Sequence, residues 1–137
     1  MIVIDTHVLV WLAQEDRRLG RAARDVIEAA RATDGVMIPA IVSWETAMLA
    51  DKERLVLGVE TSLWFTNIVA TGGFRWAALT SEIGIDAGTL PGNIHGDPGD
   101  RLIIATARHL GFPVLTGDQK ILRYAAAGHV NAVDARD

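Results

Sequence analysis

The sequence of 137 residues contains no cysteine. This absence excludes disulfide bonds and thiolate ligands, so a metal ion could be bound only by Asp, Glu or His side chains. No apolar run approaches the roughly 20 residues that a membrane-spanning helix needs. The first residues also lack the cationic segment of a secretory signal peptide. We therefore expect a cytoplasmic protein without a membrane segment.

Several motifs of metal and phosphate chemistry are also missing. The histidines include no pair at the spacing of zinc ligands; they are His7, His95, His109 and His129. No glycine-rich loop of the P-loop type is present. Asp5 is not followed two positions later by the second acid of haloacid dehalogenase-type phosphatases. These absences argue against zinc chemistry, nucleotide-binding loops and that class of phosphatase.

The formal net charge of −4, from 17 acidic and 13 basic residues, at first argues against a nucleic-acid-binding protein. Four of the acids, however, are candidates for binding cations, and the remaining 13 acids and 13 bases balance. Cations on those four acids would therefore remove the objection to a phosphate substrate. Four basic residues form a cluster, for which a solvated helix face is an equal alternative to phosphate binding: Arg17, Arg18, Arg21 and Arg24.

Short apolar runs alternate with helical patterns along the whole chain. Strands are expected at Ile2–Asp5, Val36–Ile38, Phe74–Leu79, Pro113–Thr116 and Val130–Val133. Helices are expected at Thr6–Ala13, Leu19–Ala32, Pro39–Glu53, Glu60–Thr71, Ser81–Leu90, Pro98–Leu110 and Gln119–Ala127. This alternation predicts a single α/β domain over residues 1–137, with a parallel sheet and helices on both faces. The stretch Gly84–Gly99, rich in Gly and Pro, is expected to be a mobile loop.

Four acids from separate segments are predicted to meet at one edge of this sheet. Asp5 and Asp118 follow strands, Glu45 lies beside the apolar stripe of its helix, and Asp100 lies in the first turn of another helix. The carboxyl ends of parallel strands share one edge, where α/β proteins build their sites. Clustered carboxylates repel one another, and Mg²⁺ or Mn²⁺ would compensate them. One or two such ions could support phosphodiester cleavage.

Each of these acids also has a purely structural explanation. Asp is a favoured N-cap residue, so Asp5 and Asp118 could simply cap the helices that follow them. Glu45 could pair with an arginine, because burying an unpaired carboxylate is costly. Asp97 and Asp100, separated by Pro98 and Gly99, fit an N-cap and a capping-box acid. Capping and metal binding therefore stay open as alternatives.

The aromatic residues are expected to serve the core. This prediction covers Trp11, Trp44, Trp64 and Trp76, for which base stacking is the less favoured alternative. Trp64 and Phe65, in one predicted helix, could instead line a groove for a partner.

Four stretches, in this order, resemble the PIN domain family, and within it the VapC-type toxins of prokaryotic toxin–antitoxin pairs. They are Ile4–Trp11, Ser43–Ala47, Asp97–Ala107 and Leu115–Asp118. The resemblance implies a three-layer α/β/α sandwich on a parallel sheet of about five strands. It also implies Mg²⁺- or Mn²⁺-dependent cleavage of RNA, a VapB-type antitoxin as partner and a homodimer.

Matched to the family's acid positions, Asp5, Glu45, Asp100 and Asp118 are the catalytic, metal-binding quartet. The same resemblance assigns supporting hydroxyls to two further residues and a supporting or capping role to a nearby acid: Thr6, Thr116 and Asp97.

The chain also departs from the family pattern. Ala50–Leu55 replaces a common Lys-Gly-Lys-Leu stretch, and Gly99 stands where an aromatic residue is commoner. Both departures bear on groove shape and partner contacts more than on the acids. Two other functions are kept as alternatives: a catalytically idle member that acts as a binding module, and a receiver-like signalling domain. The second ranks last because Asp5 is not followed by an adjacent acid.

Overall fold

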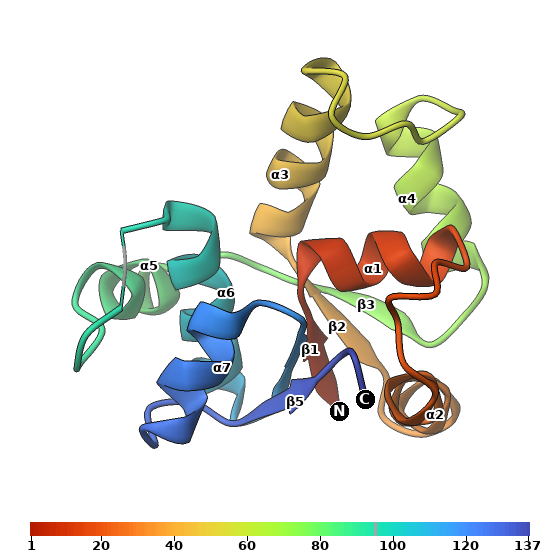
Figure 1. The fold of residues 1–137 in the computed structure, drawn as a ribbon. Helices are drawn as coiled ribbons and strands as arrows, with labels where there is room; N and C mark the ends of the chain where they lie inside the picture. The colour runs from red at the N-terminus through yellow and green to blue at the C-terminus, as the bar shows by residue number, and fades with distance from the viewer. Residues whose placement is uncertain (95) are drawn as a thin grey trace.

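The computed structural model describes residues 1–94 and 96–137, and in these residues a five-stranded sheet lies between helices (Figure 1). The strands are β1 (Ile2–Ile4), β2 (Val36–Pro39), β3 (Phe74–Ala77), β4 (Val114–Thr116) and β5 (Ala132–Asp134). The helices are α1 (Thr6–Ala13), α2 (Arg21–Ala32), α3 (Ala40–Asp51), α4 (Thr61–Ala70), α5 (Ser81–Gly88), α6 (Pro98–Leu110) and α7 (Gln119–Ala126). The predicted α/β sandwich with a parallel sheet is confirmed. His95, one of the histidines weighed against zinc binding, lies outside the described residues.

The strand order β3-β2-β1-β4-β5 determines where a site can form. All four strand pairs are parallel. The chain first builds the sheet outward from β1 to β2 and β3, and then adds β4 and β5 on the other side of β1. The direction of winding therefore reverses between β1 and β4. In open α/β sheets the crevice at such a reversal, at the carboxyl ends of the strands, is the usual ligand site.

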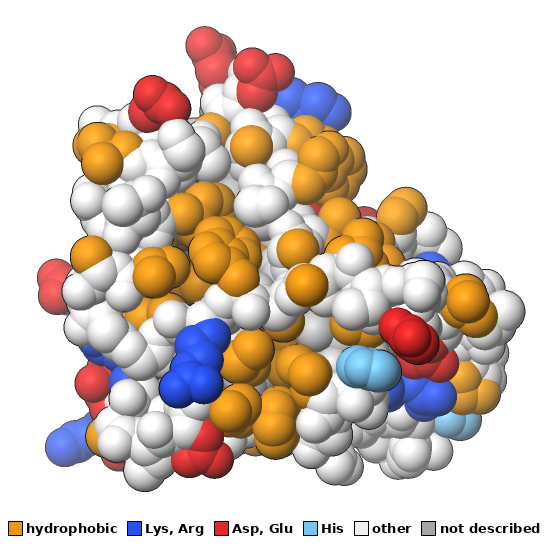
Figure 2. All heavy atoms as spheres, turned by 180° about the vertical axis from the view of Figure 1, so that it is seen from behind, with side chains coloured by type: hydrophobic (Ala, Val, Ile, Leu, Met, Phe, Trp, Pro, Cys, Tyr) orange, Lys and Arg blue, Asp and Glu red, His pale blue; other side chains and the backbone are white. Residues whose placement is uncertain are grey.

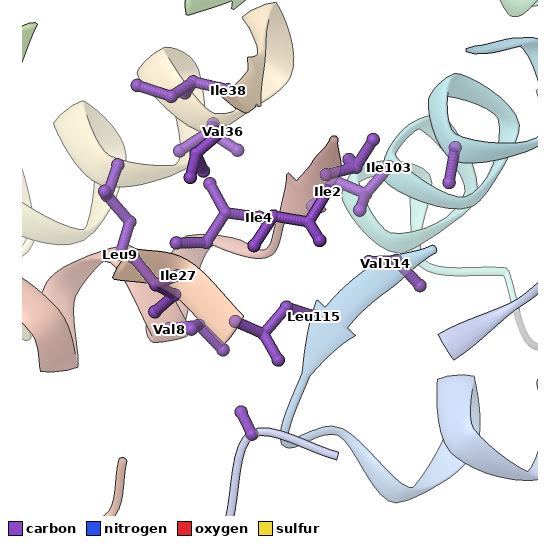
Figure 3. Packing of buried hydrophobic residues seen from close by; sticks show 14 of the residues in the cluster. Ile2, Ile4, Val8, Leu9, Ile27, Val36, Ile38, Ile103, Val114 and Leu115 are labelled. Carbon is purple, nitrogen blue, oxygen red and sulfur yellow. The ribbon is translucent and has the colours of Figure 1, made fainter. Parts of the chain in front are cut away.

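The core forms where the apolar central strands meet the helices. Side chains of β1, β2 and β4 pack with those of α1, α2 and α6 in one buried cluster (Figure 3). Val3, Ile4 and Ile103 are among its fully buried members. Strands that are buried on both faces read as continuous apolar runs, which explains why β1 and β4 were predictable. Truncating such a residue to Ala costs about 2–5 kcal/mol, so the strand ends are rigidly placed.

Three expectations from the sequence are wrong in part. The first is the loop at Gly84–Gly99, because α5 continues to Gly88 after Thr80 caps its first turn. The other two concern Trp44 and Trp76, whose side chains are 55% and 44% exposed. Trp44 is exposed because α3 projects from the sheet and packs only part of its surface against α4 and α6 (Figure 1). Trp11 and Trp64 are buried, as predicted.

None of the helices in the described part of the chain combines the length and the apolar character that crossing a bilayer requires.

Candidate active site

Asp5 lies at the carboxyl end of β1, where the chain turns directly into α1. It caps this helix, because its Oδ1 accepts a hydrogen bond of 2.7 Å from the backbone N–H of Thr6. Its other oxygen, Oδ2, accepts one of 2.6 Å from the hydroxyl of Thr116 at the end of β4. The side chain is buried at 5% exposure. Burial raises the pKa of Asp5, although the Thr116 and Thr6 hydrogen bonds oppose this rise.

Glu45 reaches the same edge from α3. The hydroxyl of Thr6 donates a hydrogen bond of 2.9 Å to its Oε1, so the first residue of α1 is joined to α3 directly after Asp5. Gly99 in α6 lies against this carboxylate: a Cβ at this position would be 2.6 Å from Oε2 and 2.9 Å from Oε1. The absent side chain of Gly99 therefore leaves the space that Glu45 occupies. This contact gives a physical role to a position where the sequence departs from the family pattern.

Asp97 and Asp100 begin α6 as an N-cap and a first-turn acid. The Oδ1 of Asp97 accepts a hydrogen bond of 3.0 Å from the backbone N–H of Asp100, and Pro98 occupies the start of the helix. Asp100 is only partly exposed. The predicted cap at Asp97 is confirmed, and the cap directs the first turn of α6 toward the carboxyl edge of the sheet.

Thr116 and Asp118 form the fourth part of the site, after β4. The Thr116 hydroxyl donates to Asp5 and accepts a 3.0 Å hydrogen bond from the backbone N–H of Asp118. Asp118 caps α7 with one oxygen, Oδ1, which accepts from Lys120 N at 2.7 Å and Ile121 N at 3.2 Å. Its Oδ2 makes no hydrogen bond to a residue in the described ranges. The capping alternative is therefore correct for Asp118 and leaves one oxygen available.

The acids are close enough to change one another's protonation. The pKa of Asp100 is raised to about 8, chiefly by burial and also by the charges of neighbouring acids, which are Asp5, Asp97, Asp118 and Glu45. The pKa of Glu45 is raised to about 7. Burial is the largest cause and the charges of Asp5 and Asp97 add to it, whereas the Thr6 hydrogen bond lowers the pKa. A group of acids that resist ionisation together is a strong candidate for a functional site.

The structure therefore brings all four predicted acids, with Thr6, Thr116 and Asp97, to one edge of the sheet. This placement does not by itself make them metal ligands. Within residues 1–94 and 96–137, no three Asp, Glu or His side chains converge closely enough to hold a metal ion. The donor chemistry nevertheless fits one class of ion: every donor is a carboxylate or hydroxyl oxygen, which hard cations such as Mg²⁺ and Mn²⁺ prefer. Added positive charge would also relieve the repulsion that raises the pKa values of Asp100 and Glu45.

A cavity of about 380 Å³ opens beside Asp5 and Asp118, at the winding reversal between β1 and β4. It is also lined by Trp11, Arg18 and Arg136. Sequence reasoning identified Trp11 only as a core residue and Arg18 only as part of a basic cluster, and it did not identify Arg136. No local pattern marks Arg136, because its place depends on β5 lying next to β4.

Comparisons with known proteins agree with this geometry. The PIN domain family matches residues 2–127. A curated relative, Ribonuclease VapC22 from Mycobacterium tuberculosis, is 34% identical over 120 residues, which cover 88% of each chain. The residues that the family model matches include all four acids.

Solved structures share the fold at lower sequence identity. The VapBC2 complex from Rickettsia felis, bound to a DNA fragment of its promoter, contains a chain with a TM-score of 0.69 and 14% identity, covering 98% of each chain. VapBC-1 from nontypeable Haemophilus influenzae contains one with a TM-score of 0.67 and 17% identity over the whole of both chains. A toxin–antitoxin complex from Klebsiella pneumoniae gives 0.64 and 19%, with 98% of each chain covered. The chain thus belongs to the PIN domain family and is a relative of VapC-type ribonucleases.

Proposed function

We propose that this chain is a metal-dependent endoribonuclease that acts as the toxin of a toxin–antitoxin pair. The observation that carries the proposal is the group of buried and half-buried acids at the carboxyl edge, in which Asp5, Glu45 and Asp118 all raise the pKa of Asp100. The curated relative at 34% identity is named a ribonuclease, and this supports RNA as the substrate. Residues 1–137 would act as one domain, in the cytoplasm.

In this proposal Asp5, Glu45, Asp100 and Asp118 bind Mg²⁺ or Mn²⁺. Such an ion activates water at neutral pH and stabilises the charge that develops as a phosphodiester bond breaks. The chain's own contribution is positional. Thr6 holds Glu45 and Thr116 holds Asp5, each through a hydroxyl donor.

The proposal is tested by a substitution that separates capping from metal binding. Asn caps a helix about as well as Asp, and a single oxygen of Asp118 accepts both capping hydrogen bonds. Asp118→Asn should therefore leave the free energy of unfolding nearly unchanged while abolishing RNA cleavage with Mn²⁺. Asp5→Asn is a poorer test, because both oxygens of Asp5 accept hydrogen bonds. Asp25→Asn, on the exposed face of α2, is the matched control.

Two outcomes would contradict the proposed function. Cleavage by the wild-type protein that persists in EDTA would exclude a metal-dependent reaction. A folded wild-type protein that cleaves none of a range of structured RNAs with Mn²⁺ would favour the alternative of a catalytically idle binding module.

The antitoxin would bind in an apolar groove formed by α3, α4 and β3. The groove has a volume of about 620 Å³, and Ala47, Phe65 and Trp76 are among its lining residues. Figure 2, which shows the molecule from behind, displays hydrophobic side chains gathered over this face. A hydrophobic groove of this kind accepts the apolar face of a helix. The toxin–antitoxin complexes among the structural neighbours support an antitoxin as the partner. Phe65, proposed from the sequence for such a groove, lines it, whereas Trp64 is buried and is not among its lining residues.

Ala47→Glu tests the groove by placing a charge in it. This change should weaken copurification with a coexpressed VapB-type antitoxin, because the buried charge would have no partner. RNA cleavage by the isolated toxin should be unaffected. Ala22→Glu, at an exposed position of α2, is the control. Equal copurification of the two variants would exclude the groove, and light scattering on the same samples would test the proposed homodimer.

A further inference from the structure

Arg136, which lines the cavity beside Asp5 and Asp118, lies over an aromatic ring. Trp11, on α1, is 5% exposed and forms part of the cavity wall. The guanidinium carbon of Arg136 lies 5.5 Å from the centroid of the Trp11 ring, and that of Arg18 lies 5.2 Å from it. An arginine stacked on an aromatic ring keeps the N–H donors at the edge of its guanidinium group free for another ligand. The Trp11 ring therefore orients these donors without using them.

Gly117 allows this arrangement to form next to the acids. A Cβ at this position would be 2.8 Å from the Trp11 ring and 3.4 Å from Nε of Arg136. Gly117 lies between Thr116, which holds Asp5, and Asp118. The backbone that carries the acids thus passes directly against the arginine and its aromatic support.

The two arginines differ in their charge environment. Arg18 makes two hydrogen bonds to Asp16, of 3.1 and 2.7 Å, so its charge is already balanced by a neighbouring acid. The guanidinium of Arg136 makes no hydrogen bond or ion pair with any residue in the part of the chain that the structure describes. Of the two arginines that line this cavity with Asp5 and Asp118, Arg136 is therefore the one whose charge is not already paired.

We propose that Arg136, supported by Trp11, binds a backbone phosphate of the RNA next to the phosphate that is cleaved. This inference rests on the proposed ribonuclease function. The acids of the site repel a polyanion, so substrate binding needs compensating positive charge at the edge of the site. A planar guanidinium donates two parallel hydrogen bonds to a phosphate, and phosphate contacts of this kind set the register of a nucleic acid. Arg136 would thus be a positioning residue.

A second groove, also lined by basic residues, is the alternative location for the RNA phosphate. It has a volume of about 530 Å³ and is lined by Lys120, Arg123 and His129, among others. Neither Asp5 nor Asp118 lines it. A phosphate bound there would be farther along the strand from the acids, so Arg123→Gln separates the two locations.

The experiment measures RNA binding and cleavage by four variants of the full chain. The binding probe is a fluorescently labelled pool of single-stranded RNA with random sequence, about 12 nucleotides long, which is within the usual range for one binding site. Binding is measured in EDTA, to prevent cleavage, at a series of salt concentrations. Cleavage is measured with Mn²⁺ on the same pool. The variants are Arg136→Gln, Arg136→Lys, Arg123→Gln and, as control for the loss of one exposed arginine, Arg54→Gln.

Arg136→Gln should weaken RNA binding about tenfold, because one charge-assisted contact is lost. The slope of log affinity against log salt should become shallower by about 0.7, the value for one phosphate contact to a single strand. KM should rise while kcat stays nearly constant, because the contact acts equally in the bound substrate and in the transition state. Arg136→Lys should keep the salt slope, and Arg54→Gln should match the wild type.

The outcomes separate this inference from the function on which it rests. If the wild type binds and cleaves RNA while Arg136→Gln has the same salt slope and KM, the phosphate contact is refuted and the ribonuclease stands. If Arg123→Gln alone reduces the slope, the phosphate lies in the second groove. If the wild type neither binds nor cleaves the RNA, the proposed function itself fails. Urea unfolding of Arg136→Gln should stay within about 1 kcal/mol of the wild type, because the hydrogen bond to Asp134 is donated by the backbone N–H and an exposed contact with the Trp11 ring is worth about 0.5–1 kcal/mol.

Discussion

Gly99→Ala should separate the stability of this protein from its activity. In most helices this change is favourable, because Ala restricts the unfolded chain more than Gly does. Gly99 lies in the first turn of α6 and has no left-handed backbone conformation that would exclude Ala. Gly99 differs from other helical glycines because it lies against Glu45. A new Cβ would be 2.6 Å from Oε2 and from Cδ of this glutamate.

The size of the effect follows from that distance. Few real contacts of a Cβ are shorter than 3.4 Å, so the carboxylate of Glu45 must retreat by about 0.8 Å, the difference between 3.4 and 2.6 Å. A displacement near 1 Å at a reacting centre costs about 100-fold in rate. Stability should change little. The gain of about 0.4–1 kcal/mol from Gly→Ala offsets the loss of the Thr6–Glu45 hydrogen bond, worth about 1 kcal/mol.

The assay compares Gly99→Ala with Gly84→Ala, a change within α5 where a Cβ would meet no atom within 4 Å. Cleavage of structured RNAs with Mn²⁺ gives the activity, and urea unfolding gives the stability. Gly84→Ala should gain up to about 1 kcal/mol and keep full activity. Wild-type activity in Gly99→Ala would refute the reasoning, because Glu45 would then tolerate displacement. A loss of several kcal/mol in stability would show that the contact is not relieved by moving a flexible side chain.

Three further predictions concern protonation and buried hydroxyls. In the metal-free protein the free energy of unfolding should fall as the pH rises from about 5 to about 8. Asp100 and Glu45 have pKa values of about 8 and about 7 in the folded protein, so they keep protons that the unfolded chain loses near pH 3.8 and 4.5. Asp100→Asn should flatten this decline in urea titrations, and an equal decline in the variant would contradict the assignment. Thr116→Val should cost about 1–3 kcal/mol by removing the hydroxyl between Asp5 and Asp118, whereas Thr106→Val, which loses only a bond to a backbone carbonyl of its own helix, should cost less. Thr46→Val should raise stability by about 1 kcal/mol in the same assay, because this buried hydroxyl has no hydrogen-bond partner among the described residues; a decrease would reveal a bound partner such as water.

Local signals in the sequence predicted the helices that carry the acids. The bounds of α1 and α6 agree with prediction to the residue. Asp5 marks the start of α1, and Asp97 with Pro98 marks the start of α6. Gly111 ends α6 in a left-handed conformation with φ 73°. Such signals act over three or four residues, so a single sequence contains all the information that they need.

Other features depended on how distant segments pack. The exposure of Trp44 and Trp76 follows from the way α3 and α4 project from the sheet, and no local pattern describes that projection (Figure 1). The contact between Gly99 and Glu45 joins α6 to α3. The stacking of Arg136 on Trp11 joins the end of the chain to its first helix. In both contacts the two partners are more than 50 positions apart in the sequence.

The sequence by itself determined the residue types of the site, the caps that start its helices, and the family to which the chain belongs. Alternating apolar and helical segments also determined that the sheet is parallel, because parallel strands need crossover helices. Only the tertiary structure decided which hydroxyl holds which acid, and how strongly the acids resist ionisation. Thr116 and Asp5 are 111 positions apart and meet because β4 pairs with β1. Burial and proximity then raise the pKa values of Glu45 and Asp100, and both depend on the distances and the solvent exclusion that packing creates.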